Sequence, residues 1–259
     1  MTDLVGRVAL VTGGGRGIGR ATAIALAEAG VDVAVVARSK NELEETADAV
    51  RRLGRRGEGF VCDVTQRQDV EATLARVREA LGEPLILVNN AGIASGAKLA
   101  DTTDELWDRT MLVNATGAFY WTRAVMPLML KAGWGRVVNV ASVAAKAAAP
   151  YMVAYAVSKH AMLGLTRAVA SEVAAKGITV NAICPGYVDT PMTQGSIDNI
   201  NARTGRSPLD ARKILEGFSP QGRLMTAEEV AGLAAFLCTE VARGITGQGI
   251  ILDGGSVQG

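Results

Sequence analysis

The chain has 259 residues, 49% of them apolar, with 27 basic and 26 acidic side chains and a net charge of +1. This apolar content is enough to bury a sizeable core and excludes a largely disordered chain. Because no basic surplus exists to neutralise phosphate backbones, the composition argues against a nucleic-acid partner.

The N-terminal residues and the cysteines show no sign of export or of a metal site. The first residues lack a basic stretch followed by an apolar one, and no apolar run approaches the ~20 residues of a membrane helix. Cys62, Cys184 and Cys238 are far apart and odd in number, which favours buried thiols over a metal cluster or a disulfide framework. We therefore expect a soluble cytoplasmic protein with no membrane partner and no metal.

Short β-branched runs alternate along the chain with longer stretches rich in Ala, Leu and Glu. The predicted strands are residues 8–11, 33–37, 59–62, 86–88, 137–140, 180–183 and 249–252. The predicted helices are residues 17–29, 40–53, 67–81, 104–131, 155–176 and 227–238. This alternation predicts a doubly wound, Rossmann-type α/β fold, with a parallel seven-stranded sheet flanked by helices on both faces. No linker divides the chain, so we interpret residues 1–259 as a single domain.

Residues 189–224 depart from this alternation of predicted strands and helices. The segment is polar, and Gly195, Gly205, Pro208 and Pro220 interrupt short helical pieces. A long insertion after the carboxyl end of a strand is typical of a lid over a functional site. The alternative is a variable surface excursion.

A glycine-rich turn, Thr12-Gly13-Gly14-Gly15-Arg16-Gly17-Ile18-Gly19, follows the first predicted strand and opens the first helix. In that context Gly13 permits the tight turn, Gly17 lets backbone approach a pyrophosphate, and Gly19 lets helix and sheet pack closely. The helix N-terminus then offers free N–H groups to the phosphates. The turn predicts a dinucleotide site, against the alternative of a turn that serves packing alone.

The end of the second strand favours NADP(H) over NAD(H). An acid at this place would hold the ribose 2′-hydroxyl of NAD, whereas an arginine could accept a 2′-phosphate. The sequence has no acid between residues 33 and 40, but it has Arg38 and Ser39, with Arg16 in the glycine turn. If Arg38 is merely solvated, NAD(H) stays possible.

Two further segments follow predicted strands and border the same place. Asp63 could accept from the adenine amino group, or could cap a turn. The run Asn89-Asn90-Ala91-Gly92 offers small residues and an amide, which would let backbone pass close to a cofactor. Its alternative interpretation is a plain turn.

Tyr155 and Lys159 lie four residues apart, so on a helix their side chains share one face. An ammonium beside a phenol stabilises the phenolate, so we expect Lys159 to lower the pKa of Tyr155. Ser142 follows the fifth strand, where its hydroxyl could bond a substrate oxygen. These residues predict carbonyl reduction with Tyr155 as acid, or the reverse oxidation with Tyr155 as base.

Asn114 lies within the predicted helix 104–131, although asparagine is a poor helix former and a buried amide needs partners. Either its side chain stabilises a local kink, or it belongs to a water-mediated proton path toward Lys159. His160, the only histidine, points away from Lys159, so we interpret it as structural or exposed.

Together these motifs resemble the classical short-chain dehydrogenase/reductase family, and they cover the whole chain in family order, through Pro185-Gly186 and Thr190 to Asp253-Gly254-Gly255. The resemblance implies a catalytic tetrad of Asn114, Ser142, Tyr155 and Lys159. It also implies a cofactor-binding set of Gly13, Gly15, Arg16, Gly17, Ile18, Gly19, Arg38, Ser39, Asp63, Val64, Asn90, Ala91, Gly92, Tyr155, Lys159, Pro185, Gly186, Val188, Thr190 and Met192. Family members usually form tetramers or dimers, which here would use helices 104–131 and 155–176.

The substrate pocket is expected between the loop after the fifth strand, the catalytic helix and the lid. Its predicted lining is Ser142, Val143, Ala144, Ala149, Tyr151, Tyr155, Gly186, Tyr187 and Met192. Small residues leave room and large apolar ones offer surface, which suits a medium-sized hydrophobic ketone or a 3-oxoacyl substrate. Arg203, Arg206 and Arg212 could attract an acidic carrier such as coenzyme A, or could form a solvated face that balances acids of the lid.

The sequence therefore predicts an NADP(H)-preferring oxidoreductase of the ketoreductase type, resembling polyketide ketoreductases and 3-hydroxyacyl dehydrogenases. An NAD-linked secondary-alcohol or 3-hydroxyacyl-CoA dehydrogenase is the alternative enzyme. A non-catalytic NADP-binding redox sensor is disfavoured because Tyr155 and Lys159 are both present.

Overall fold

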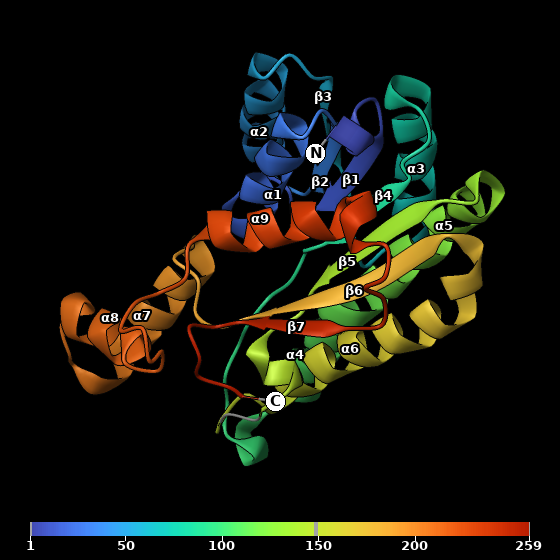
Figure 1. Cartoon of the computed structure of the whole chain (residues 1–259). Helices are drawn as coiled ribbons and strands as arrows, with labels where there is room; N and C mark the ends of the chain where they lie inside the picture. The colour runs from blue at the N-terminus through green and yellow to red at the C-terminus, as the bar shows by residue number, and fades with distance from the viewer. Residues whose placement is uncertain (1, 148–149, 259) are drawn as a thin grey trace.

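A single parallel sheet organises the chain in the computed structural model, which describes residues 2–147 and 150–258 (Figure 1). Its strand order is β3-β2-β1-β4-β5-β6-β7, and every neighbouring pair runs parallel. The strands are β1 (Val8–Thr12), β2 (Asp32–Ala37), β3 (Gly57–Val61), β4 (Ile86–Asn89), β5 (Gly135–Val140), β6 (Ile178–Pro185) and β7 (Gly249–Leu252). The expected doubly wound sheet of seven strands is confirmed.

Helices cover both faces of the sheet. The helices are α1 (Gly17–Glu28), α2 (Lys40–Arg52), α3 (Arg67–Leu81), α4 (Asp104–Met111), α5 (Gly117–Ala132), α6 (Val153–Val173), α7 (Pro191–Thr204), α8 (Pro208–Glu216) and α9 (Ala227–Cys238). Helices α1, α2 and α9 share one buried apolar cluster, and α3, α5 and α6 share the other. In β1, Ala9 and Val11 belong to the first cluster, whereas Val8 and Leu10 belong to the second. Burial on both faces explains why the strands are apolar without alternation.

The order of the strands places a crevice at the carboxyl end of β1. From β1 the chain continues to β2 and β3 on one side, whereas β4 to β7 lie on the other. Loops leaving β1 and β4 therefore diverge to opposite sides of the sheet. In open α/β sheets, ligands bind in the crevice at such a switch point.

The predicted helix 104–131 is interrupted, which corrects the expectation of one regular helix. After α4 the chain forms a π-helical turn, Leu112–Thr116, and then continues as α5 to Ala132. The side chain of Asn114 lies in this turn and bonds backbone outside the helix, so the wider turn coincides with an amide that has outside partners. The predicted helix 155–176 starts earlier, at Val153, and its last turn is a 3₁₀ turn, Ala174–Lys176.

The insertion at residues 189–224 contains helices α7 and α8, which stand apart from the two layers (Figure 1). They enclose a small apolar cluster of their own, with Ile197, Ala211 and Leu215 buried against Leu224. The expected helical insertion is therefore present, and its own core lets it pack as a unit.

A substitution at Gly19 tests how closely α1 packs on the sheet. A Cβ at Gly19 would lie 2.2 Å from the Gly13 carbonyl oxygen, whereas one at Gly232, within α9, would meet no atom within 4 Å. We expect Gly19→Ala to lower the free energy of unfolding by about 1–3 kcal/mol because backbone must move. The matched control Gly232→Ala should leave it unchanged or raise it by about 0.5–1 kcal/mol. Denaturant unfolding followed by circular dichroism measures both, and equal effects of the two substitutions would contradict this packing.

Candidate active site

The glycine turn lies directly against the loop after β4. Gly13 and Gly17 adopt positive φ angles of 62° and 53°. The Asn90 amide nitrogen donates to the carbonyl oxygens of Thr12 and Gly13, each at 3.0 Å. The hydroxyl of buried Thr12 accepts from the backbone nitrogens of Asn90 and Ala91 at 3.0 and 3.1 Å. Thr12 and Asn90 therefore order the two loops.

This junction opens into a cavity of about 680 Å³. The predicted cofactor residues that line it are Gly13, Gly15, Arg16, Gly17, Ile18, Arg38, Ser39, Asp63, Val64, Asn90, Ala91, Gly92, Thr190 and Met192. The first turn of α1 has neither a side-chain cap nor an acid, so its N–H groups are available to an anion. The cavity and its glycine-lined wall fit a dinucleotide.

Six predicted cofactor residues lie outside this lining: Gly19, Tyr155, Lys159, Pro185, Gly186 and Val188. Gly19 serves the packing of α1, and Val188 is buried in the core cluster that includes α9. At Gly186 a Cβ would lie 2.9 Å from the Cβ of Asp253, so this glycine permits a close approach of two loops.

The cavity also has lining residues that the sequence interpretation missed: Ala37, Glu42, Cys62, Thr65, Ile93, Asp108, Arg109, Leu112, Val113 and Pro191. Ala37, Cys62, Thr65, Ile93 and Pro191 are neighbours of predicted residues in the loops after strands. Glu42, Asp108 and Arg109 are different, because each comes from within a helix and carries charge. No local motif marks them, since only the fold brings these helices to the crevice.

Asp63 follows β3 and lines the cavity. Its carboxylate accepts from the backbone and hydroxyl of Thr65 at 3.0 and 2.8 Å. Burial alone would raise the pKa of Asp63, but these hydrogen bonds and the charges of Arg38 and Arg109 lower it below its usual range. The turn-capping interpretation of Asp63 is confirmed, while its contact with adenine stays a prediction.

The predicted catalytic residues come together at the carboxyl end of β5. Lys159 is 4% exposed, and its amine donates to the Val140 carbonyl oxygen at 2.9 Å. The same amine lies 5.7 Å from the centre of the Tyr155 ring. The Ser142 hydroxyl lies near enough to the Tyr155 phenol to lower its pKa, and it accepts from the Ala144 nitrogen at 3.1 Å.

The protonation of this pair differs from the sequence-based expectation. Burial raises the pKa of the Tyr155 phenol above its ordinary value, and the Ser142 hydroxyl offsets this in part. Burial lowers the pKa of Lys159 to about 8. In the protein chain by itself burial therefore dominates, and the pKa of Tyr155 is raised where we expected it to be lowered. That the Lys159 charge stabilises the phenolate stays a prediction.

Asn114 is fully buried and ties the π-helical turn to its surroundings. Its side chain accepts from the Ile93 nitrogen at 2.8 Å and donates to the Ile93 carbonyl oxygen at 2.9 Å and to the Ser158 hydroxyl at 3.0 Å. A Cβ at Gly92 would lie 3.4 Å from the Asn114 carbonyl oxygen Oδ1 and 3.6 Å from Lys159 Nζ. Gly92 also lines the cavity, so it joins the cavity to the tetrad. The irregular helix that we considered is confirmed, while a proton path toward Lys159 stays a prediction.

The predicted substrate residues come from several segments, after β5, before and within α6, after β6 and at the start of α7. Ser142, Val143 and Ala144 form the turn after β5, and Ala149 lies outside the described residues. Tyr151 is exposed, with a φ of 68°, and its carbonyl oxygen accepts from the Ala97 nitrogen at 2.8 Å. Tyr187 stacks on Phe218 of the insertion, with ring centres 5.7 Å apart. Phe218 was not among the predicted residues, because nothing local places it beside Tyr187.

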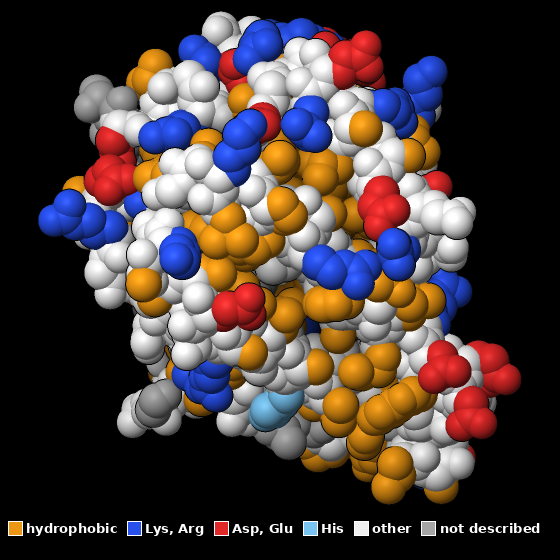
Figure 2. Space-filling view, turned by 90° about the vertical axis from the view of Figure 1, so that its right-hand side faces the viewer, with side chains coloured by type: hydrophobic (Ala, Val, Ile, Leu, Met, Phe, Trp, Pro, Cys, Tyr) orange, Lys and Arg blue, Asp and Glu red, His pale blue; other side chains and the backbone are white. Residues whose placement is uncertain are grey.

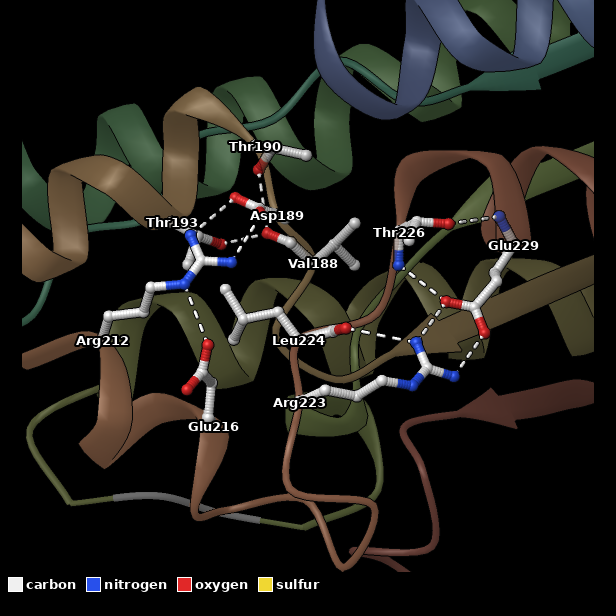
Figure 3. A network of polar contacts seen from close by, with 10 residues as sticks. All are labelled: Val188, Asp189, Thr190, Thr193, Arg212, Glu216, Arg223, Leu224, Thr226 and Glu229. Carbon is white, nitrogen blue, oxygen red and sulfur yellow. Dashed lines mark hydrogen bonds and ion pairs between the residues drawn. The ribbon is translucent and has the colours of Figure 1, made fainter. Parts of the chain in front are cut away.

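Ion pairs and a backbone bridge join the segments at the base of the insertion, and Figure 3 shows the ion pairs. Arg212 of α8 reaches Asp189 at 2.6 Å and Glu216 at 2.9 Å. The Asp189 nitrogen donates to the Met225 carbonyl oxygen at 2.8 Å, so the segments that enter and leave the insertion lie side by side. Arg212 is thus paired within the protein, which weakens its predicted attraction for an acidic carrier.

Within the described residues 2–147 and 150–258, no helix is both long and apolar enough to span a bilayer. The same residues contain no cluster of three or more His, Cys, Asp or Glu side chains suited to a metal ion. The crevice is lined by carboxylates and guanidinium groups as well as by hydroxyls, amides and backbone N–H groups.

Comparisons with known proteins agree with this arrangement. A family model described as short chain dehydrogenase matches residues 7–201. The chain is 38% identical to the 3-oxoacyl-(acyl-carrier-protein) reductase FabG of Pseudomonas aeruginosa, over 98% of each protein. It is 37% identical to the D-beta-hydroxybutyrate dehydrogenase of Rhizobium meliloti, over 96% of this chain and 98% of the relative.

A solved structure is similar over nearly the whole chain. It is a point variant of actinorhodin polyketide ketoreductase with NADPH, with a TM-score of 0.93 and 38% identity over 96% of this chain and 97% of that one. The matching model, these relatives and the crevice geometry lead to one assignment. The protein belongs to the short-chain dehydrogenase/reductase family.

Proposed function

We propose that this protein is an NADP(H)-dependent ketoreductase that acts on a medium-sized hydrophobic ketone or a 3-oxoacyl substrate. The observation that carries the proposal is the junction at Gly92. One side of this residue lines the dinucleotide-sized cavity, and the other meets Asn114 and Lys159, whose helix also carries Tyr155. A coenzyme in the cavity would therefore end beside a proton donor.

The residues of the cavity supply the elements of coenzyme binding. The backbone N–H groups of residues 13–19 would hold the pyrophosphate, and Arg16 and Arg38 would hold a 2′-phosphate. The coenzyme supplies the hydride. The similar ketoreductase structure, which is described as a complex with NADPH, supports the preference for NADP(H).

Tyr155 would donate the proton that the new alkoxide needs. Because burial raises its pKa, the phenol stays protonated at neutral pH, which suits the direction of ketone reduction. Ser142, which lies near the phenol, would also donate to the substrate oxygen and so orient it. Lys159 would hold the coenzyme ribose and place positive charge near the phenol below pH about 8. Asn114 would hold the π-helical turn against the Ile93 loop, so that both stay in place beside Tyr155 and Lys159.

The substrate class rests on the apolar groups near Tyr155 and on the relatives. Tyr187, Phe218 and Met192 are between 42% and 58% exposed, so they offer apolar surface beside the site. One relative is named a 3-oxoacyl-(acyl-carrier-protein) reductase, and the similar structure is named a polyketide ketoreductase. Arg203 and Arg206 have no ion pair among the described residues, which leaves them as contacts for an acidic carrier.

An NAD-linked dehydrogenase is the second candidate. The relative of Rhizobium meliloti is named a D-beta-hydroxybutyrate dehydrogenase and is nearly as similar as the reductase. The two candidate enzymes share the tetrad and differ in their coenzyme and in the favoured direction of the reaction. Steady-state rates of ketone reduction with NADPH and of alcohol oxidation with NAD distinguish them.

We also propose that the protein is a cytoplasmic homotetramer or dimer that pairs through helices α4 to α6. Apolar side chains are exposed on these helices: Trp107, Phe119 and Val157 are between 37% and 41% exposed. A Cβ at Gly164 of α6 would meet no atom within 4 Å, so this face could approach another helix closely. Apolar side chains also gather on the face of the molecule that Figure 2 shows. Molar mass in solution, measured by light scattering, tests the assembly.

Replacing Tyr155 tests the proton donor. We expect Tyr155→Phe to lower kcat/KM for ketone reduction by about 10²–10⁴-fold, because the variant lacks the proton donor. NADPH affinity, measured by the quenching of protein fluorescence, should change little. Tyr120→Phe on α5 is the matched control and should keep full activity. A Tyr155→Phe variant with near-normal turnover would rule out the assigned acid.

The pH dependence tests the raised pKa of Tyr155. Oxidation of the alcohol needs the phenolate, and a raised pKa means that this form is scarce at neutral pH. We therefore expect kcat/KM for oxidation to rise up to about tenfold per pH unit above pH 7, while reduction holds steady. Ser142→Ala removes a hydroxyl that lowers this pKa, so it should move the oxidation profile to higher pH. Ser171→Ala, on the exposed face of α6, is the control; an oxidation optimum near pH 6 would contradict the assignment.

A further inference from the structure

The first turn of α2 packs against the glycine turn and brings an acid to the adenosine end of the cavity. A Cβ at Gly15 would lie 2.8 Å from the Cβ of Glu42, so these two segments are in direct contact. The Thr46 hydroxyl donates to the Gly15 carbonyl oxygen at 3.2 Å, one turn further along α2. The backbone of Glu42 is therefore fixed relative to the loop that would hold the phosphates.

The carboxylate of Glu42 faces the arginine that the proposed function assigns to the 2′-phosphate. Glu42 Oε1 lies 3.4 Å from Arg16 Nη1, and both residues line the cavity together with Arg38 and Ser39. The side chains of Arg16 and Glu42 are 67% and 36% exposed. An exposed pair at this distance is weak, so Arg16 can exchange the carboxylate for another anion at little cost.

This contact changes the electrostatic interpretation of the site. The end of β2 carries no acid, which favoured a 2′-phosphate, but the fold delivers a carboxylate to the same place from α2. Two arginines attract a phosphate there, while Glu42 repels it and competes for Arg16. An uncharged ribose hydroxyl feels little of either effect.

We propose that Glu42 is a specificity-determining residue of the adenosine end, whose negative charge limits the preference for a 2′-phosphate over a 2′-hydroxyl. The inference rests on the proposed function, because it takes Arg16 and Arg38 as the phosphate contacts. It predicts a protein that accepts both coenzymes more evenly than its two arginines alone would allow.

The test uses two ligands that represent the adenosine half of each coenzyme, 2′,5′-ADP and 5′-AMP. Their dissociation constants are measured by titration calorimetry on the whole protein and on Glu42→Gln. Glu45→Gln, an exposed acid three residues further along α2, is the matched control with the same loss of charge. Circular dichroism confirms that each variant is folded.

We expect Glu42→Gln to bind 2′,5′-ADP about three- to tenfold more tightly than the unmodified chain, with 5′-AMP changed less than twofold. The gain should shrink when salt rises from about 20 to about 300 mM, because exposed charges are screened. Glu45→Gln should change neither constant by more than twofold.

Three results would overturn the inference. An unchanged or weaker affinity of Glu42→Gln for 2′,5′-ADP would mean that Glu42 merely orders Arg16. A fivefold or larger loss of 5′-AMP affinity would make Glu42 an acceptor for the ribose hydroxyl. An equal gain in 2′,5′-ADP affinity in Glu45→Gln would mean that the effect comes from the net charge of the protein and not from the position of Glu42.

The unmodified chain tests the proposed function separately. If it binds 5′-AMP more tightly than 2′,5′-ADP, the NADP(H) preference fails, yet the shift in Glu42→Gln would still support the inference. If it binds neither ligand, the dinucleotide site itself is wrong and the inference falls with it.

Discussion

The site depends on backbone lying against backbone at the carboxyl ends of β1 and β4. Gly19 packs so close to Gly13 that no side chain fits between them, and the Asn90 amide bonds the carbonyl oxygens of Thr12 and Gly13. This contact fixes the N-terminus of α1 at the mouth of the crevice. It also fixes the start of the loop that carries Gly92, so one constraint sets the phosphate end and the position of the reactive end.

A second constraint is the burial of a cationic amine. Lys159 is nearly inaccessible, and burial lowers its pKa from 10.5 to about 8. The folded chain therefore binds fewer protons than the unfolded chain between these values, so the cost of burying the ammonium is full below pH about 8 and fades as pH rises toward 10.5. The protein tolerates this cost at neutral pH because the amine donates to Val140 and lies between Tyr155 and Gly92. Functional sites often carry such unfavourable groups.

Most of the fold and the centre of the site could be predicted from the sequence, because their signals are local. Continuous apolar runs marked the strands, and the glycine turn marked the switch point. Spacing placed Tyr155 and Lys159 on one helical face. Two features were not predicted, because each depends on contacts between segments distant in sequence. Phe218 stacks on Tyr187, and Glu42 reaches Arg16 from the next helix. The direction of the Tyr155 pKa shift was not predicted either, because residue spacing reveals a neighbouring charge but not the loss of hydration on burial.

The central claim is that one crevice brings a coenzyme and a tyrosine proton donor together. A crystal structure of the protein with NADPH and a bound ketone or alcohol tests it most directly. The account predicts the pyrophosphate at residues 13–19, with the Tyr155 and Ser142 hydroxyls both within about 3.2 Å of the substrate oxygen. A coenzyme bound elsewhere, or a Tyr155 hydroxyl that faces away from that oxygen, would contradict it.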